Sequence, residues 1–383
     1  MSDEDIKSFK DLTIEVQEKG ICGKCGGCVS FCSAGELNAL EIAEDGGPRF
    51  IDEEKCLKCG ICYLICPQIE VLNSELKEKR GWKAPIGSYR KLTSARTTNN
   101  EIRNICTDGG VVTSLLIYAL EKHLIQGAIV SKKTDPFTRQ PVLVTQPDEL
   151  IKTAGSYFDK TLHLEEIGRK YTTYSPVIRE IGSLGRGKLE SIAMVGTPCQ
   201  IYTVRKMQLL NVIPADMVTL TIGLFCMENF SFDENARDKL EKKLKIELKD
   251  VEKLNIKDDV IVTLEKGEII HLPFEAVDEI ARPACFACPD FANDYADISV
   301  GGLGSPDGYT TTIIRSGNGE KIYNSAKNDK SIEELSFKSR EDLRIHKTEI
   351  MAKIVSFSRR KKERAKKREP ESRKAREPES IEA

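Results

Sequence analysis

The chain has 383 residues, 40% hydrophobic and 31% charged, the balance of a globular protein, which excludes disorder for the bulk of the chain. Its 58 Lys and Arg against 60 Asp and Glu give a formal net charge of −2, which disfavours nucleic acid as a partner. No run approaches the roughly 20 apolar residues that cross a bilayer, so no transmembrane segment is predicted.

The first 20 residues predict a short polar leader with helical character. The opening MSDEDIKSFK is acidic, whereas a signal peptide is basic and then apolar. Without an export signal, an odd count of thirteen cysteines favours metal ligation over disulfides. We therefore expect a cytoplasmic protein, peripheral to a membrane complex only through a partner.

Two short cysteine runs form an internal repeat between residues 21 and 67. Each spaces four cysteines as C-x2-C-x2-C-x3-C, the pattern of bacterial ferredoxins with two 4Fe-4S clusters, in which the fourth cysteine of each run ligates the other cluster. Neighbouring glycines let the backbone approach a cluster closely. The sequence therefore predicts one cluster on Cys22, Cys25, Cys28 and Cys66 and another on Cys56, Cys59, Cys62 and Cys32.

Zinc is the competing interpretation of these thiols. Zinc sites use separated cysteine pairs or add histidine, and the four histidines, at positions 123, 163, 271 and 346, lie outside both runs. Iron–sulfur clusters are therefore expected. One departure from the ferredoxin pattern is that Ser33, not proline, follows Cys32, which could loosen that turn or shift a potential without removing a ligand.

A linker-like stretch at residues 77–87, with Gly81, Pro85 and Gly87, ends the cysteine-rich part. We place the leader and two-cluster ferredoxin domain at residues 1–84 and a larger domain at residues 85–355.

The larger domain alternates helical and strand patterns. TDGG at residues 107–110 precedes VVTSLLIYALEKHL, whose apolar spacing is helical, and GAIVS then suits a buried strand. Apolar runs at residues 191–195 and 217–225 predict further strands. The fold class predicted is α/β (α+β), with a small ferredoxin-like domain followed by a larger mixed α/β domain.

Residues 356–383 predict a disordered or frayed tail, basic at first and then of mixed charge. Positions 359–368 hold eight basic residues and one acidic residue, and the unit REPES then occurs twice. A solvated extension is expected, and docking onto an acidic partner surface is the alternative.

Five motifs in the larger domain resemble those of the coenzyme F420 hydrogenase/dehydrogenase beta subunits, in the order typical of that family, over residues 85–345. The resemblance implies FAD, a 4Fe-4S cluster and electron exchange with coenzyme F420. The motifs are TDGGVV from Thr107, VGTPCQ from Val195, GLFC from Gly223, RPACFACPDF from Arg282 and ADISVGGLGSPDG from Ala296.

The resemblance also gives a role to four cysteines outside the ferredoxin runs. Taken singly, Cys199 and Cys226 would be interpreted as small buried hydrophobic residues. Cys106, which has no partner in the motifs, is expected to be an inert thiol or part of a pocket wall. With the family motifs behind them, a third 4Fe-4S cluster is predicted on Cys199, Cys226, Cys285 and Cys288.

For FAD, the helix that follows the TDGG motif offers free amides and a positive dipole end to a phosphate. Asp108 could instead be only the helix N-cap, and the other candidates could be structural turns. The glycines at 301–304 predict a turn near a cofactor and not a dinucleotide fingerprint. The flavin contacts that the resemblance implies are Thr107, Asp108, Gly109, Gly110, Gly155, Ser156, Tyr157, Tyr174, Ser175, Pro176, Thr197 and Pro198.

The resemblance implies an electron-transfer subunit that exchanges hydride between F420 and FAD and relays electrons through clusters. No residue is predicted as a catalytic acid or base. The implied partners are hydrogenase, formate dehydrogenase, heterodisulfide reductase, a membrane F420H2 dehydrogenase complex or ferredoxin. Two alternatives stay open: a reductase of another small molecule that uses ferredoxin electrons, and an iron–sulfur adaptor without flavin.

Overall fold

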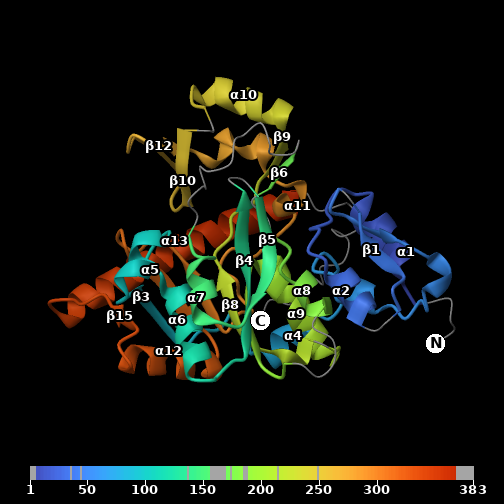
Figure 1. Ribbon diagram of the computed structural model, residues 1–383, viewed down its shortest axis with the longest axis horizontal. Coiled ribbons are helices and arrows are strands. Elements are labelled where there is room, and N and C mark those ends of the chain that lie inside the picture. Colours follow the sequence, from blue (N-terminus) through green and yellow to red (C-terminus); the bar gives the residue numbers. More distant parts are fainter. Residues whose placement is uncertain are drawn as a thin grey trace, which may run out of the picture.

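The computed structural model describes residues 6–34, 37–43, 45–135, 138–155, 170–172, 175–183, 189–213, 215–247 and 250–367. Figure 1 shows a small N-terminal segment, in blue, beside a larger body built on one long sheet, with a smaller sheet and a helix above it. The predicted mixed α/β class is confirmed. Within these residues no helix is both long enough and apolar enough to span a bilayer.

The N-terminal segment folds around its own small core. Phe9, Leu12 and Val16 of the leader are buried there, and residues 9–17 of the leader are helical. The Phe9 and Phe50 rings pack edge to face with centroids 4.9 Å apart. The elements are α1 (Phe9–Leu12), the π-helix η2 (Thr13–Gln17), α2 (Gly27–Ala34), β1 (Leu40–Ile42), β2 (Pro48–Phe50), α3 (Ile61–Leu64) and α4 (Asn73–Lys79).

Ten described strands form one mixed sheet. In spatial order they are β15 (Ile332–Glu334), β3 (Lys91–Thr97), β14 (Thr310–Ile314), β13 (Ile298–Gly301), β8 (Val218–Leu224), β7 (Ile192–Gly196), β4 (Gly127–Asp135), β5 (Thr138–Val144), β6 (Lys170–Thr172) and β9 (Ser231–Asp233). The central strands β13, β8, β7 and β4 run parallel. Parallel strands are buried on both faces and have nearly continuous apolar sequences, which is why β4, β7 and β8 were predictable.

Helices cover both faces of these central strands. Leu115 of α6 (Val111–Glu121) shares a core with Ala193 of β7, and α12 (Gly317–Asn328) packs on α6. On the other face, Ile201 of α9 (Pro198–Leu209) packs with Met194, because successive strand residues point to opposite sides. Helix α6 confirms the helix predicted after TDGG. Shorter helices are α5 (Asn100–Ile105), α7 (Pro147–Ile151) and α8 (Arg179–Ser183).

A second unit stands over the carboxyl ends of the central strands. It is an antiparallel sheet of β10 (Val251–Ile256), β11 (Val260–Leu264) and β12 (Ile269–Leu272), with α10 (Glu234–Leu244) beside it (Figure 1). The short helix α11 (Pro283–Phe286) then returns the chain to the main sheet.

The C-terminal helix α13 (Arg340–Lys367) corrects one prediction. A disordered or frayed tail was expected from residue 356, but the helix continues through Lys367. Ile350 and Ile354 anchor it in the core, and each is 0% exposed. The charge-rich run was misinterpreted because its many exposed charges conceal the helical spacing of the buried positions, one of which is itself a lysine, Lys361. The REPES units fall outside the described residues.

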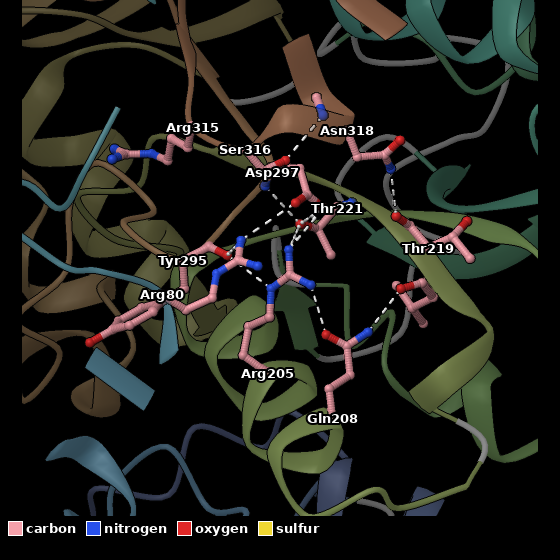
Figure 2. A network of polar contacts seen from close by, with 12 residues as sticks. Arg80, Arg205, Gln208, Thr219, Thr221, Tyr295, Asp297, Arg315, Ser316 and Asn318 are labelled. Carbon is pink, nitrogen blue, oxygen red and sulfur yellow. Dashed lines mark hydrogen bonds and ion pairs between the residues drawn. The ribbon is translucent and has the colours of Figure 1, made fainter. Parts of the chain in front are cut away.

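Polar contacts fix the end of the N-terminal segment to the large sheet. Figure 2 shows the Arg80 and Arg205 guanidinium groups turned toward Asp297, and their distances to its carboxylate are 3.4 and 2.8 Å. Burial alone would raise the pKa of Asp297, but these two cations lower it to about 2. Trp82 Nε1 also donates to Asp294 at 3.0 Å. The stretch predicted as a linker is therefore packed against the body of the protein.

Candidate redox centres and cofactor pocket

The first predicted thiol set surrounds a small cavity. Cys22, Cys25, Cys28 and Cys66 all line a space of about 30 Å³, and Cys62 reaches its edge. Burial, followed by the charges of Cys25 and Cys22, raises the pKa of Cys28 well above its ordinary value. The fold thus gathers the fourth cysteine of the second run with the first three of the first run.

The second predicted set surrounds another cavity, of about 20 Å³, lined by Cys32, Cys56, Cys59 and Cys62. Burial and the thiols of Cys59 and Cys56 raise the pKa of Cys62 to about 12. Cys59 is exposed, so this set reaches the protein surface.

The third predicted set comes from three places along the chain. Cys199 is the second residue of α9, Cys226 follows β8, and Cys285 and Cys288 lie in and just after α11. Burial raises the pKa of Cys226, and the nearby thiols of Cys285, Cys199 and Cys288 raise it further. Coordination to a metal deprotonates such thiols outright.

Backbone amides point at sulfur in these sets. The amides of Lys24, Ala39 and Asn229 donate to Cys22, Cys32 and Cys285 at 3.5, 3.3 and 3.4 Å. Amide hydrogen bonds to sulfur are a known determinant of iron–sulfur potentials.

Within the described part of the chain, no group of His, Cys, Asp and Glu is tight enough for a single metal ion. The first two sets are spaced around cavities, an arrangement that fits a cubane, which is larger than an ion.

Thr203 of α9 lies between the first and third thiol sets. Its Oγ1 is 3.9 Å from Cys25 Sγ and donates to the Cys199 carbonyl oxygen at 2.9 Å. A Cβ on Gly27 would stand 2.5 Å from Thr203 Cγ2, so only glycine permits this approach. Lys206, one turn along α9, donates to the carbonyl oxygens of Cys66 and Ile69.

A cavity of about 440 Å³ opens where the central parallel strands end. Its walls include Ser131 of β4, Thr197 after β7, Phe225 after β8 and Gly301 at the end of β13. Ligands of open α/β sheets bind in this position, at the carboxyl edge of the strands. Cys226 of the third thiol set is part of the same wall.

The predicted flavin residues separate into three groups. Thr107, Asp108, Gly110, Gly155 and Thr197 line this cavity. Gly109, Ser175, Pro176 and Pro198 are described but are not among the lining residues, and Gly109 packs instead on Ala95 and Thr310. Ser156, Tyr157 and Tyr174 lie outside the described residues.

Asp108 is a wall residue and not the N-cap of α6, which is Gly110 at φ 71°. Burial raises the pKa of Asp108, and donation from Asn255 Nδ2 at 3.1 Å opposes this. A Cβ on Gly302 would stand 2.6 Å from Asp108 Oδ1. Gly302 thus leaves room for this carboxylate, and Gly301 leaves room for the Phe225 ring.

The sequence did not reveal several wall residues. Arg139, Asn255 and Lys257 lie on β5, on β10 and just after β10, without a motif of their own. Only the folding of the small sheet over the strand ends brings Asn255 and Lys257 to the cavity. Cys106 also lines the cavity, which matches its predicted role as part of a pocket wall.

Comparisons with known proteins agree with this architecture. Models described as the N-terminal and C-terminal parts of the coenzyme F420 hydrogenase/dehydrogenase beta subunit match residues 92–177 and 189–340. A 4Fe-4S binding domain model matches residues 49–68.

Among relatives, coenzyme F420 hydrogenase subunit beta of Methanosarcina barkeri is 33% identical over 63% of this chain and 80% of its own length. A subunit of the F(420)H(2) dehydrogenase of Methanosarcina mazei is 28% identical over 84% of this chain and 86% of its own length. Coenzyme F420-dependent sulfite reductase of Methanocaldococcus jannaschii is 34% identical over 81% of this chain but only 46% of its own length, so this chain spans about half of it.

A chain of the F420-reducing NiFe hydrogenase complex from Methanosarcina barkeri superposes with a TM-score of 0.62 at 30% identity, covering 75% of this chain and 93% of that one. Fold, motifs and relatives agree, and the chain belongs to the family of coenzyme F420 hydrogenase/dehydrogenase beta subunits.

Proposed function

We propose that this chain is an electron-transfer oxidoreductase subunit that exchanges hydride between coenzyme F420 and FAD and relays single electrons through three 4Fe-4S clusters. The observation that carries the proposal is the wall that the 440 Å³ cavity shares with Cys226 of the third thiol set. Relatives named for F420 support F420 as the substrate.

We place the flavin dinucleotide in this cavity. Its volume of about 440 Å³ is typical of ligand pockets. The N-terminus of α6 opens onto it, and the amides there suit a phosphate. When bound, FAD would supply the change between two-electron hydride transfer and one-electron transfer.

Two cations of the wall suit the negative charge of such a ligand. Arg139 Nη2 donates to the Ser131 carbonyl oxygen at 3.0 Å, and its Nη1 donates to that of Gly155 at 3.2 Å. These contacts hold the guanidinium at the cavity edge. Lys257 Nζ is held at 2.6 Å from Asp307. In the proposal these side chains bind phosphate oxygens or the anionic part of F420.

The order of the thiol sets gives the proposed relay. The third set adjoins the cavity, the first set adjoins the third through Thr203, and the second set reaches the surface at Cys59. A partner redox protein would therefore dock at Cys59. Hydrogenase, formate dehydrogenase, heterodisulfide reductase, F420H2 dehydrogenase complexes and ferredoxin are the candidate classes. A cytoplasmic location stays a prediction from the sequence.

A variant of Cys226 tests this order. In anaerobically prepared protein, reduced F420 is expected to bleach the flavin and then to reduce the ferredoxin clusters, followed by electron paramagnetic resonance. Cys226→Ser removes one ligand of the third cluster only. We expect flavin bleaching to persist while reduction of the ferredoxin clusters slows sharply.

Two results would contradict the proposal. One is protein that retains flavin and all clusters but exchanges no electrons with F420, and turnover of another small molecule would then favour the alternative reductase. The other is a Cys226→Ser variant whose ferredoxin clusters are reduced at the wild-type rate.

A further inference from the structure

Helix α13 turns one face toward the third thiol set. Its buried residues Ile350, Ile354, Ser358, Lys361 and Ala365 recur every three or four positions, which is one face of an α-helix. The family match ends at residue 340, where this helix begins. The contacts of α13 with the thiols are therefore not part of what the family match describes.

Lys361 is the charged residue of that face. Its side chain is 1% exposed, and Nζ donates to the carbonyl oxygen of Cys226. Burying an ammonium group beside a neutral carbonyl is costly unless negative charge stands nearby. Burial alone would lower the pKa of Lys361, but the nearby thiols of Cys288, Cys226 and Cys285 and the carboxylate of Asp290 raise it above its ordinary value.

Arg364, one turn further on, is already neutralised. Its Nη1 donates to Glu228 Oε2 at 2.7 Å, and its Nη2 donates to the Met227 carbonyl oxygen at 3.0 Å. The guanidinium also lies 4.6 Å from the Phe286 ring centroid in α11. Arg364 therefore fastens the helix beside the thiols, and Lys361 is the buried cation of α13 that donates to the Cys226 carbonyl oxygen.

We propose that Lys361 is a positioning residue that raises the reduction potential of the third cluster through its buried positive charge. The inference rests on the third cluster of the proposed function. Reduction adds one electron to a cluster held by four thiolates, and a fixed ammonium group stabilises the more negative product. In the proposed function the flavin would supply this electron.

Redox titration of the full chain, followed by electron paramagnetic resonance, tests this. Lys361→Met should shift the one-electron equilibrium of the third cluster at least tenfold toward the oxidised form, about 59 mV lower in potential. The two ferredoxin clusters should keep their potentials. Lys361→Arg, which keeps the charge, should stay close to the wild type.

Lys362→Met is the matched control. The neighbouring Lys362 points its Nζ to the Pro85 carbonyl oxygen and lies 5.4 Å from the Trp82 ring centroid. Removing the Lys362 ammonium group should leave the third cluster at the wild-type potential.

A second variant covers the case in which Lys361→Met loses iron. Lys361→Gln keeps a donor for the Cys226 carbonyl oxygen but removes the charge, and it then replaces Lys361→Met in the titration.

The possible results separate the role of Lys361 from the proposed function of the chain. An unshifted third cluster in Lys361→Met or Lys361→Gln overturns the role of Lys361 and leaves the proposed function intact. An equal shift of all three clusters also overturns it, because the effect would not be local. A wild-type protein with no third cluster overturns both claims.

Discussion

Asp297 joins the two parts of the molecule, because two guanidinium groups share its carboxylate. Arg80 comes from the stretch that ends the N-terminal segment, and Arg205 comes from α9. Both oxygens are used, because Arg80 donates to Oδ1, whereas Arg205 and the Thr221 amide donate to Oδ2. Removing this carboxylate would leave buried positive charge uncompensated.

We therefore predict that Asp297→Asn lowers the free energy of unfolding by about 3–5 kcal/mol near neutral pH. Because the folded pKa of Asp297 is lowered from 3.8 to about 2, the carboxylate stabilises the fold above pH 3.8, and this contribution is lost as the pH falls towards 2. Denaturant titrations at several pH values should show the difference between the two proteins shrinking over that interval.

The control is Asp329→Asn, which removes an exposed ion pair with Lys122 at 3.2 Å. Such pairs contribute about 0–1 kcal/mol, so little change is expected. Equal stability of Asp297→Asn and wild type at neutral pH would contradict the role given to Asp297.

At the scale of single residues, the sequence predicts those groupings that the local spacing of residues determines. Eight cysteines in two runs specify their own grouping, and the cavities they line agree with it. Asn255 and Lys257 could not be predicted, because their place in the cavity depends on packing between distant segments.

At the scale of elements, the carboxyl ends of β7, β8 and β13 determine where the cavity lies. The apolar runs made β7 and β8 predictable, but strand order comes from long-range pairing, which apolar runs do not encode. Helix α13 was missed for a different reason, because its local signal was present but hidden. Its buried positions 354, 358, 361 and 365 follow helical spacing, a signal that the dense basic residues around them concealed.

The turn after β13 gives a prediction at this scale. Gly302→Ala would place a methyl group 2.6 Å from Asp108 Oδ1 and push that side chain within the cavity. We expect flavin affinity to fall about tenfold or more, a cost of about 1.4 kcal/mol or above. Fluorescence titration of the flavin-free protein with FAD measures this.

Gly317→Ala, at the start of α12, serves as the control because an added Cβ there meets nothing within 4 Å. It should bind FAD as the wild type does. Unchanged FAD affinity in Gly302→Ala would place the flavin elsewhere.

At the scale of the whole molecule, the N-terminal segment is packed against the sheet and not tethered by a free linker. Trp82, Arg80 and Lys206 all take part in this contact. A rigid junction keeps the first and third thiol sets adjacent at Thr203, which a relay of single electrons requires. The sequence predicted two parts but not their fixed arrangement, since no local pattern encodes contacts between them.

Cofactor content tests the central claim most directly. Iron, acid-labile sulfide and flavin should be measured in anaerobically prepared, reconstituted protein. The proposed function predicts about twelve irons, about twelve sulfides and about one FAD per chain. About eight irons without flavin would favour the adaptor, and zinc or bare thiols in place of iron and sulfide would contradict the claim altogether.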